Sequence, residues 1–313
     1  FDKQNITSIG AKIIVEELKK NTPMSTNGSI LVLGGNNLGD TGIKIIEKLG
    51  HAGLSFEETP GILSIRHGVF SWGKTIEEAF KKYDSKPAYN ALGQTMSFAE
   101  MELLSAQFGA WLLAKGNLVP GDRIAIQLPN LLQNPIAVYG ALRAGLVVVN
   151  TNPLYTPTEM AHQFSDSGAK ALVILEDFVD KYESIKDQTQ IQTVIVTPAP
   201  QMLNKQKSAL AYTCFMQVFE EAQGLELPTR PTTSLDETCI LQYTGGTTGV
   251  SKGAELTHNN VLANSIQVLG RLGKSFKEGE EILICPLPLY HIYAFTVAMM
   301  TLFSKGAMCV LIP

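Results

Sequence analysis

Apolar residues from Lys74 onward follow two alternating patterns. In one pattern they are spaced three or four residues apart, as on one face of a helix, and in the other they form short runs typical of buried strands. The predicted helices cover 76–83, 98–113, 135–143 and 158–167. The predicted strands cover 123–127, 147–149, 171–175 and 193–196. Because helices and strands alternate, we expect a layered α/β sheet.

Two further stretches differ from this alternation. The polar stretch from Pro198 to Arg230 is predicted to be a connection on the surface. The longest apolar stretch, Ala294 to Phe303, is well short of the roughly 18 residues that a membrane-spanning helix needs. It predicts a buried helix, and any membrane contact would be peripheral.

The segment YTGGTTGVSKGA, residues 243–254, contains four glycines, three threonines, a serine and a lysine. It offers too little apolar area to be core, and its glycines raise the entropy that folding must remove. Hydroxyls, bare backbone N–H groups and one ammonium suit a polyanion such as ATP. The alternative interpretation is a surface loop with turn glycines.

The surroundings of this segment limit the type of phosphate loop. A Walker A motif is excluded, because Lys252 lies three residues beyond Gly249 and is followed by glycine. Residues 239–243 and 254–257 read as strands, and a helix begins near Asn259, so the loop is predicted to link two strands. A kinase glycine loop also links two strands, but neither His-Arg-Asp nor Asp-Phe-Gly follows.

The segment resembles the phosphate-binding signature of the adenylate-forming (AMP-binding) superfamily. Three more segments look like bacterial long-chain fatty acid CoA ligases and occur in that family's order: DRIAIQLPN (122–130), YGALRAGLVVVNTNPLY (139–155) and PLPLYHIYAF (286–295). The resemblance runs from about Lys74 to Pro313. It implies an incomplete N-terminal adenylation domain of layered α/β fold over 74–313.

The resemblance also implies a reaction and its co-substrates, ATP, Mg²⁺ and CoA. A fatty carboxylate would attack the α-phosphate of Mg-ATP, and the CoA thiol would then displace AMP from the acyl-adenylate. Lys252 would offset phosphate charge as pyrophosphate leaves, and the Thr244 hydroxyl would reach the metal. The residues expected to bind the phosphates are Tyr243, Thr244, Gly245, Gly246, Thr247, Thr248, Gly249 and Lys252.

The acyl side of the site is expected at residues 290–293. By resemblance, His291 would orient the fatty carboxylate, and Tyr290 and Tyr293 would line the acyl tunnel. The alternatives are a core histidine and ordinary core aromatics. His258 is assigned to helix capping or structure. The family's YGxTE segment, its TGD aspartate and its C-terminal domain with the adenylation lysine would lie beyond Pro313, so the 313-residue chain alone is expected to be inactive.

Residues 1–50 follow a different pattern. Residues 31–38 fit the LxLxxNxL of a leucine-rich repeat, and a weaker copy lies 32 positions upstream, so we expect a short β/α repeat fragment and a protein partner for it. Residues 51–73 read as a linker. The competing interpretation is a dinucleotide-binding turn, but glycines 35, 39 and 42 give GxxxGxxG rather than GxGxxG.

Composition narrows the function classes. The chain is 45% apolar and 17% charged, which is typical of a globular protein, and its net charge of −4 gives no footprint for nucleic acid. The four cysteines show no CxxC spacing, which predicts neither a zinc site nor a disulfide framework and favours a cytoplasmic location. Two functions remain: a long-chain fatty acid CoA ligase fragment, or a non-catalytic interaction protein with a remnant adenylation domain.

Overall fold

The computed structural model describes residues 72–199, 212–229, 234–244, 250–273 and 276–313. The leucine-rich-repeat prediction for 1–50 and the linker prediction up to residue 71 lie outside the described residues. Within these ranges the first element is helix α3 (Trp72–Lys82), which agrees with the helix predicted over 76–83.

The larger sheet has seven strands in the order β7-β6-β5-β3-β4-β8-β9. All neighbours are parallel except β8 and β9. The strands are β3 (Arg123–Gln127), β4 (Val147–Asn150), β5 (Ala169–Leu175), β6 (Thr193–Thr197), β7 (Thr213–Cys214), β8 (Thr238–Thr244) and β9 (Lys252–Thr257). Parallel order together with apolar strands confirms the predicted layered α/β sheet.

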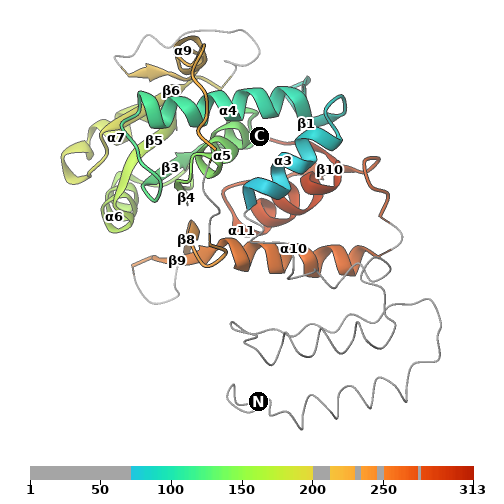
Figure 1. Cartoon of the computed structure of the whole chain (residues 1–313). Helices are drawn as coiled ribbons and strands as arrows, with labels where there is room; N and C mark the ends of the chain where they lie inside the picture. The colour runs from blue at the N-terminus through green and yellow to red at the C-terminus, as the bar shows by residue number, and fades with distance from the viewer. Residues whose placement is uncertain (1–71, 200–211, 230–233, 245–249, 274–275) are drawn as a thin grey trace, which may run out of the picture. The chain divides into compact units, whose positions relative to one another are not determined.

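Helices cover both faces of this sheet (Figure 1). On one face, α4 (Phe98–Ala114), α5 (Gln133–Arg143) and α9 (Phe215–Glu221) pack against side chains such as Ile124 and Ile126. On the other, α6 (Pro157–Ser167) and α7 (Val179–Glu183) pack against alternate residues. The central strands β3, β4 and β5 are therefore buried on both sides, which is why they read as apolar runs.

Two glycines allow α4 and α5 to lie unusually close. A Cβ on Gly109 would lie 2.7 Å from the carbonyl oxygen of Gly140, and a Cβ on Gly140 would lie 2.9 Å from the carbonyl oxygen of Ser105. Any larger side chain at either position would push the helices apart. The spacing between α4 and α5 therefore depends on these two residues.

A second sheet was not predicted. It contains four strands in the order β10-β11-β1-β2: β10 (Ile282–Cys285), β11 (Met308–Leu311), β1 (Pro87–Ala91) and β2 (Gln94–Ser97). A two-residue turn joins β1 to β2, with positive φ at Leu92 (50°) and Gly93 (80°). Strand β1 pairs in parallel with β11, so two segments far apart in the chain form one sheet.

Buried aromatic rings fill the space between α3 and the smaller sheet. The Phe303 ring lies within contact distance of four others, those of Phe80, Tyr89, Phe98 and Tyr139. The two tyrosine hydroxyls lie 2.7 Å apart, and that of Tyr139 also donates to the carbonyl oxygen of Met299 at 2.5 Å. These contacts satisfy the polar atoms of rings that are otherwise completely enclosed.

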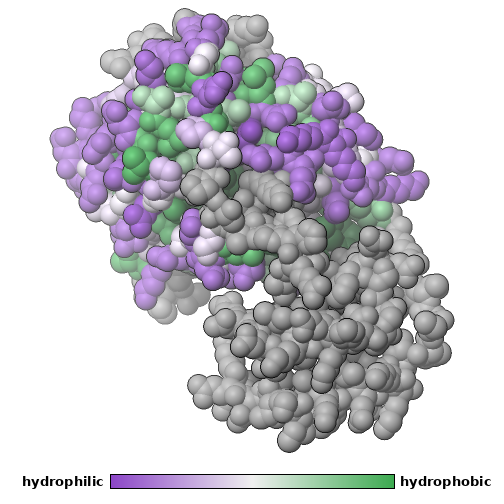
Figure 2. All heavy atoms as spheres, in the orientation of Figure 1, coloured by the Kyte–Doolittle hydropathy of each residue, from purple (hydrophilic) through white to green (hydrophobic). Residues whose placement is uncertain are grey.

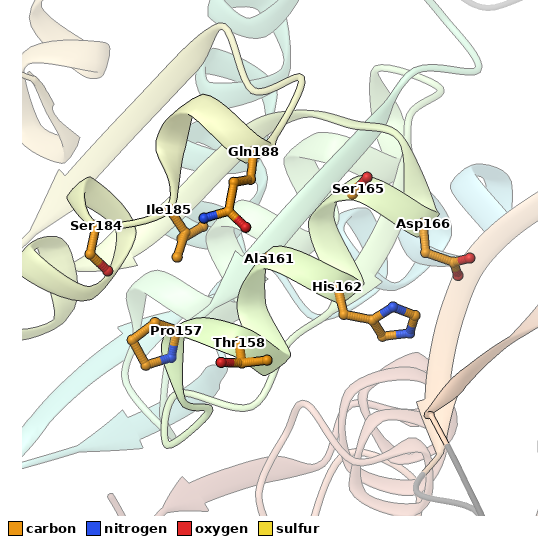
Figure 3. A pocket seen from close by; sticks show the side chains of 9 residues that line it. All are labelled: Pro157, Thr158, Ala161, His162, Ser165, Asp166, Ser184, Ile185 and Gln188. Carbon is orange, nitrogen blue, oxygen red and sulfur yellow. The ribbon is translucent and has the colours of Figure 1, made fainter.

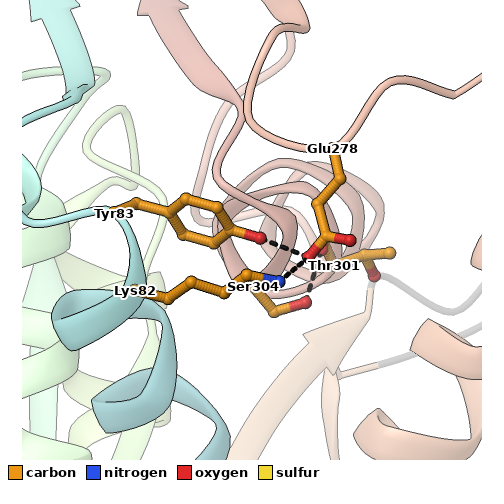
Figure 4. A network of polar contacts seen from close by, with 5 residues as sticks. All are labelled: Lys82, Tyr83, Glu278, Thr301 and Ser304. Carbon is orange, nitrogen blue, oxygen red and sulfur yellow. Dashed lines mark hydrogen bonds and ion pairs between the residues drawn. The ribbon is translucent and has the colours of Figure 1, made fainter.

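The end of α3 is also held from the far end of the chain. In Figure 4, Lys82 and Tyr83 converge on Glu278. The Lys82 ammonium lies 2.6 Å from the carboxylate, which also accepts a hydrogen bond from the Tyr83 hydroxyl. Burial and this hydrogen bond raise the pKa of Tyr83 to about 12. The phenol therefore stays a donor at neutral pH.

The segment predicted as a buried helix over 294–303 is helical and buried, with one difference. After α11 (Ile292–Ala294), the chain forms a π-helix, η4 (Phe295–Leu302), and then a 3₁₀ turn, η5 (Phe303–Lys305). The Thr301 hydroxyl donates to the carbonyl oxygen of Thr296, five residues earlier, at 2.8 Å. No helix in the described part of the chain is long and apolar enough to cross a membrane.

The prediction of a surface connection over 198–230 is wrong for 213–221. These residues form β7, which extends the large sheet, and α9, whose Phe215 and Val218 are fully buried. Trp111 of α4 donates its indole N–H to Glu221 at 2.8 Å. Helix α9 was missed because it has only seven residues and lies within a polar stretch of sequence, so its apolar pattern is too short to stand out.

Three further elements complete the described chain: the short 3₁₀ turns η1 (Glu176–Phe178) and η2 (Lys186–Gln188) and the 15-residue helix α10 (His258–Leu272). Hydrophilic side chains cover most of the described part of the face in Figure 2, with smaller hydrophobic groups between them.

Candidate functional site

The glycine-rich segment lies between β8 and β9, as the sequence predicts. The two strands are antiparallel, and Thr244 at the end of β8 pairs with Lys252 at the start of β9. Both side chains are exposed. Residues Gly245, Gly246, Thr247, Thr248 and Gly249 lie outside the described residues. Thr244 also lies at the carboxyl edge of β8, which runs parallel to β4, and this is the edge of α/β sheets where ligands bind.

The ring of Tyr243 packs across the two strands at the base of this hairpin. The ring lies over its cross-strand partner, Gly253, where a Cβ would be 2.9 Å from two ring carbons. Only glycine leaves room for the ring at this position. The Tyr243 hydroxyl donates to the Asp166 carboxylate at 2.5 Å, and burial together with this hydrogen bond raises the pKa of the phenol.

A second contact reaches the other side of the loop. His162 Nε2 lies 2.8 Å from the carbonyl oxygen of Ser251. A carbonyl can only accept, so this contact requires the proton on Nε2. Ser251 directly precedes Lys252, and His162 is on the same helix as Asp166.

The predicted acyl-side residues lie on the segment after β10. Asn130, which follows β3, forms hydrogen bonds with the backbone of this segment. Its Oδ1 accepts from the backbone N–H of Leu289 at 2.8 Å, and its Nδ2 donates to the carbonyl oxygens of Leu287 (3.0 Å) and Cys285 (3.2 Å). Asn130 is only 3% exposed, so these bonds replace the ones it would make with water.

His291 is the N-cap of α11, and its Nδ1 accepts from the backbone N–H of Tyr293 at 3.3 Å. The imidazole is exposed, so the core-histidine alternative is wrong. Tyr293 is 59% exposed, which excludes an ordinary core role for it as well. Tyr290 is half-buried, and this burial raises the pKa of its phenol.

A chain of buried amides connects the hairpin to the acyl-side segment. Gln242, next to Tyr243 on β8, donates from Nε2 to the carbonyl oxygen of Tyr290 at 3.3 Å. Its Oε1 accepts from Asn150 at the end of β4 at 3.0 Å. The carbonyl of Asn150 in turn accepts from Gln163 of α6 at 3.0 Å. Gln242 therefore fixes Tyr290, and with it His291, relative to the glycine-rich hairpin.

The sequence analysis missed Asn130, Asn150 and Gln242. Their signal was present: each is an amide at or just beyond the end of an apolar strand, where a buried polar side chain needs a partner. Their backbone partners could not be read from the sequence. His258 is buried as the first residue of α10, which agrees with a structural role, although the cap itself is Thr257 with Asn260.

Two side chains of types that can bind metals, His162 and Asp166, contact the described part of the hairpin, and both are engaged in hydrogen bonds. Over the described ranges, no three or more His, Cys, Asp or Glu side chains gather to hold an ion. The exposed hydroxyl of Thr244 would supply one oxygen ligand to Mg²⁺, which proteins usually bind through one or two carboxylates, substrate phosphates and several waters.

A groove of about 630 Å³ lies beside α6 (Figure 3). Its lining includes Thr158 and Asp166 of α6 and Ile185 and Gln188 from the segment after α7. Of the predicted site residues that the structure describes, none lines this groove. His162 and Asp166 line the groove and also contact the hairpin.

Comparison with known proteins places this geometry in a family. Residues 76–313 match the model of the AMP-binding enzyme family. The chain belongs to that family. The superfamily inferred from the four segments is thereby confirmed over these residues.

Several AMP-binding enzymes are similar to this chain. The long-chain-fatty-acid–CoA ligase of Escherichia coli O157:H7 is 39% identical over 254 residues, which are 76% of this chain and 45% of that relative. The enzyme of the same name from Haemophilus influenzae is 37% identical over 258 residues, 76% of this chain and 46% of that relative. The chain thus spans about half the length of these curated relatives.

The fold is shared with solved AMP-binding enzymes. A crystal structure of the anthranilate CoA ligase AuaEII in complex with anthranoyl-AMP superposes with a TM-score of 0.69 at 19% identity. The match covers 78% of this chain and 45% of that one. At this identity the likeness concerns the fold alone, and it agrees with the α/β sheet and flanking helices described above.

Proposed function

We propose that this chain is part of a long-chain fatty acid CoA ligase. The observation that carries the proposal is the pairing of Thr244 with Lys252 at the carboxyl edge of the sheet, tied through Gln242 to the segment of Tyr290 and His291. One hairpin thus presents groups suited to phosphates, and a neighbouring segment presents an exposed histidine suited to a carboxylate. The identity to long-chain-fatty-acid–CoA ligases supports this class of substrate.

The proposed reaction has two steps. The fatty carboxylate oxygen bonds to the α-phosphorus of ATP, and the bond from that phosphorus to pyrophosphate breaks. The sulfur of CoA then bonds to the acyl carbon, its proton is released, and the bond to AMP breaks. Mg²⁺, when bound, would neutralise phosphate charge.

The chain's own residues would position the reactants and stabilise charge. Thr244 and the backbone N–H groups of the glycine-rich loop would surround the β- and γ-phosphates. Tyr243 would lie at the base of the hairpin that carries this loop. The Lys252 ammonium would oppose the charge that develops on leaving pyrophosphate. His291 would donate a hydrogen bond to the fatty carboxylate from Nε2, because Nδ1 is engaged by Tyr293. Tyr290 and Tyr293 would contact the first part of the acyl chain.

The test is exchange of labelled pyrophosphate into ATP. The polypeptide is purified as its own cells produce it, and the assay is run with palmitate, with acetate and without acid. We expect exchange that depends on palmitate and is much weaker with acetate, since each buried CH₂ contributes about 0.8 kcal/mol to binding. Absence of exchange with every acid tested would contradict the proposal.

Replacing His291 tests the acyl side separately. We expect His291→Ala to raise the KM for palmitate about ten- to a hundredfold, because a hydrogen bond to a charged group contributes about 1.5–3 kcal/mol. The KM for ATP should stay the same. His291→Asn keeps an acceptor for the backbone N–H of Tyr293, so equal loss in both variants assigns the effect to substrate. Full activity of His291→Asn would instead assign it to the helix cap.

The non-catalytic interaction protein is the less favoured function, because the matched relatives are ligases over the same residues. Four points remain predictions: a leucine-rich-repeat fragment at 1–50, a protein partner for that fragment, peripheral membrane contact and a cytoplasmic location.

A further inference from the structure

Helix α6 contacts the chain on both sides of the glycine-rich loop. Asp166 accepts from the hydroxyl of Tyr243, which directly precedes Thr244. His162 donates to the carbonyl oxygen of Ser251, which directly precedes Lys252. The two contacts therefore reach the chain next to the two residues that pair across the hairpin at the base of the loop.

The two side chains are four residues apart, so they lie on the same side of α6, one turn from each other. In Figure 3 both point from α6 toward the orange strands and away from Ser184 and Ile185. The His162 ring also lies edge-on to the Tyr243 ring, with centroids 6.4 Å apart. The helix thus meets the hairpin through two hydrogen bonds and one ring contact.

A positioning role requires that α6 itself be fixed, and several contacts fix it. Thr156 and Glu159 form a capping box at its start, and Gly168 ends it in the left-handed conformation with φ 63°. Met160 and Phe164 are completely buried in the core. On a third side, Gln163 bonds to the end of β4. The helix is therefore a rigid support, unlike an isolated turn on the surface.

We propose that His162 and Asp166 are positioning residues that hold both sides of the phosphate-binding loop against α6. Neither side chain needs to touch ATP. Each restricts the backbone at one side of the loop, so that Thr244 and Lys252 face the phosphates before ATP arrives. Holding Tyr243 and Ser251 in this way lowers the entropy lost at the base of the hairpin on binding, which improves affinity without a new contact to the ligand. The proposal rests on the proposed function, since it assigns ATP to this hairpin.

The test compares variants on α6 in the polypeptide as its own cells produce it. In the double variant His162→Ala/Asp166→Ala we expect the KM for ATP to rise about tenfold, which corresponds to about 1.4 kcal/mol. The KM for palmitate and the thermal midpoint should not change. Ser165→Ala, on the same helix and facing the groove, is the matched control.

Two conservative variants separate positioning from general structure. His162→Gln keeps an amide N–H near the place of Nε2 and should restore most of the ATP affinity lost in His162→Ala. Tyr243→Phe removes only the hydroxyl and should match Asp166→Ala. If wild-type enzyme is active and the KM for ATP in the double variant equals that of Ser165→Ala, the proposal is overturned.

A second measurement keeps this test independent of the reaction. Amide hydrogen exchange of β8 and β9 is compared between the 313-residue wild type, Ser165→Ala and the double variant. Faster exchange at the loop-proximal ends of both strands, in the double variant alone, supports the positioning role. If the polypeptide that its own cells produce shows no pyrophosphate exchange, the proposed function is rejected, and the amide hydrogen exchange then decides the positioning role alone. Unchanged exchange in that case overturns it.

Discussion

Lys252→Met is expected to slow fatty-acid-dependent pyrophosphate exchange by about a hundred- to a thousandfold. Removing one preorganised group that stabilises developing charge typically has an effect of this size. Methionine keeps a long apolar stem at the start of β9 and removes only the ammonium. The side chain is exposed and paired in register with Thr244, so its loss leaves the strand pairing intact. The effect should therefore fall on the maximal rate, with the thermal midpoint unchanged.

Matched variants show whether this loss comes from charge at this position. Lys252→Arg retains the positive charge and should recover part of the rate. Lys115→Met removes an exposed lysine at the C-terminal end of α4 and should leave the rate within a factor of two. A maximal rate in Lys252→Met within threefold of wild type would show that the reaction does not use this ammonium.

The hairpin that carries Lys252 was predictable because its signals are local. Apolar residues mark β8, the glycine-rich composition marks the loop, and both lie within twenty or so residues of sequence. The same holds for the core strands: β3, β4 and β5 are buried on both faces, and burial appears in the sequence as an uninterrupted apolar run.

The smaller sheet could not be predicted because its pairings are not local. β1 pairs with β11, more than two hundred positions further along the chain, and each strand has only four or five residues. The hydrogen bonds that hold the acyl-side segment are of the same kind. Asn130 bonds to backbone groups about 155 residues away, and no pattern near Asn130 names those partners.

The links between the predicted site residues were also invisible in sequence. The glycine-rich loop and PLPLYHIYAF are separate motifs, and the connection between them is one buried side chain, Gln242. Its position next to Tyr243 made it look like part of a strand. Only the fold shows that it bonds to the carbonyl of Tyr290 and to Asn150 at once. The motifs thus predict which residues carry the chemistry, whereas they do not reveal the groups that hold those residues in place.

Phe303→Ala is expected to lower the free energy of unfolding by about 3–5 kcal/mol, the usual cost of removing a buried phenylalanine ring. Phe303 is 1% exposed, and its ring centroid lies 4.5 Å from that of Phe98 and 4.8 Å from that of Tyr139. The rings of Phe98 and Tyr139 belong to α4 and α5. Removing the Phe303 ring would therefore remove the packing between these two helices and the chain at the end of η4. Urea denaturation of the 313-residue chain, followed by tryptophan fluorescence, measures the change.

Two comparisons decide whether this cost comes from the buried ring. Leu103→Ala, on α4 but 57% exposed, should change the free energy of unfolding by less than about 0.5 kcal/mol. Phe303→Leu fills part of the cavity and should fall between that control and Phe303→Ala. A loss below about 1 kcal/mol in Phe303→Ala would mean that the neighbouring rings close over the space. In that case the remaining rings of the cluster, Phe80, Tyr89 and Tyr139, would be sufficient to hold the smaller sheet against α5. The segment α11–η4, which follows His291, would then not depend on the Phe303 ring for its position.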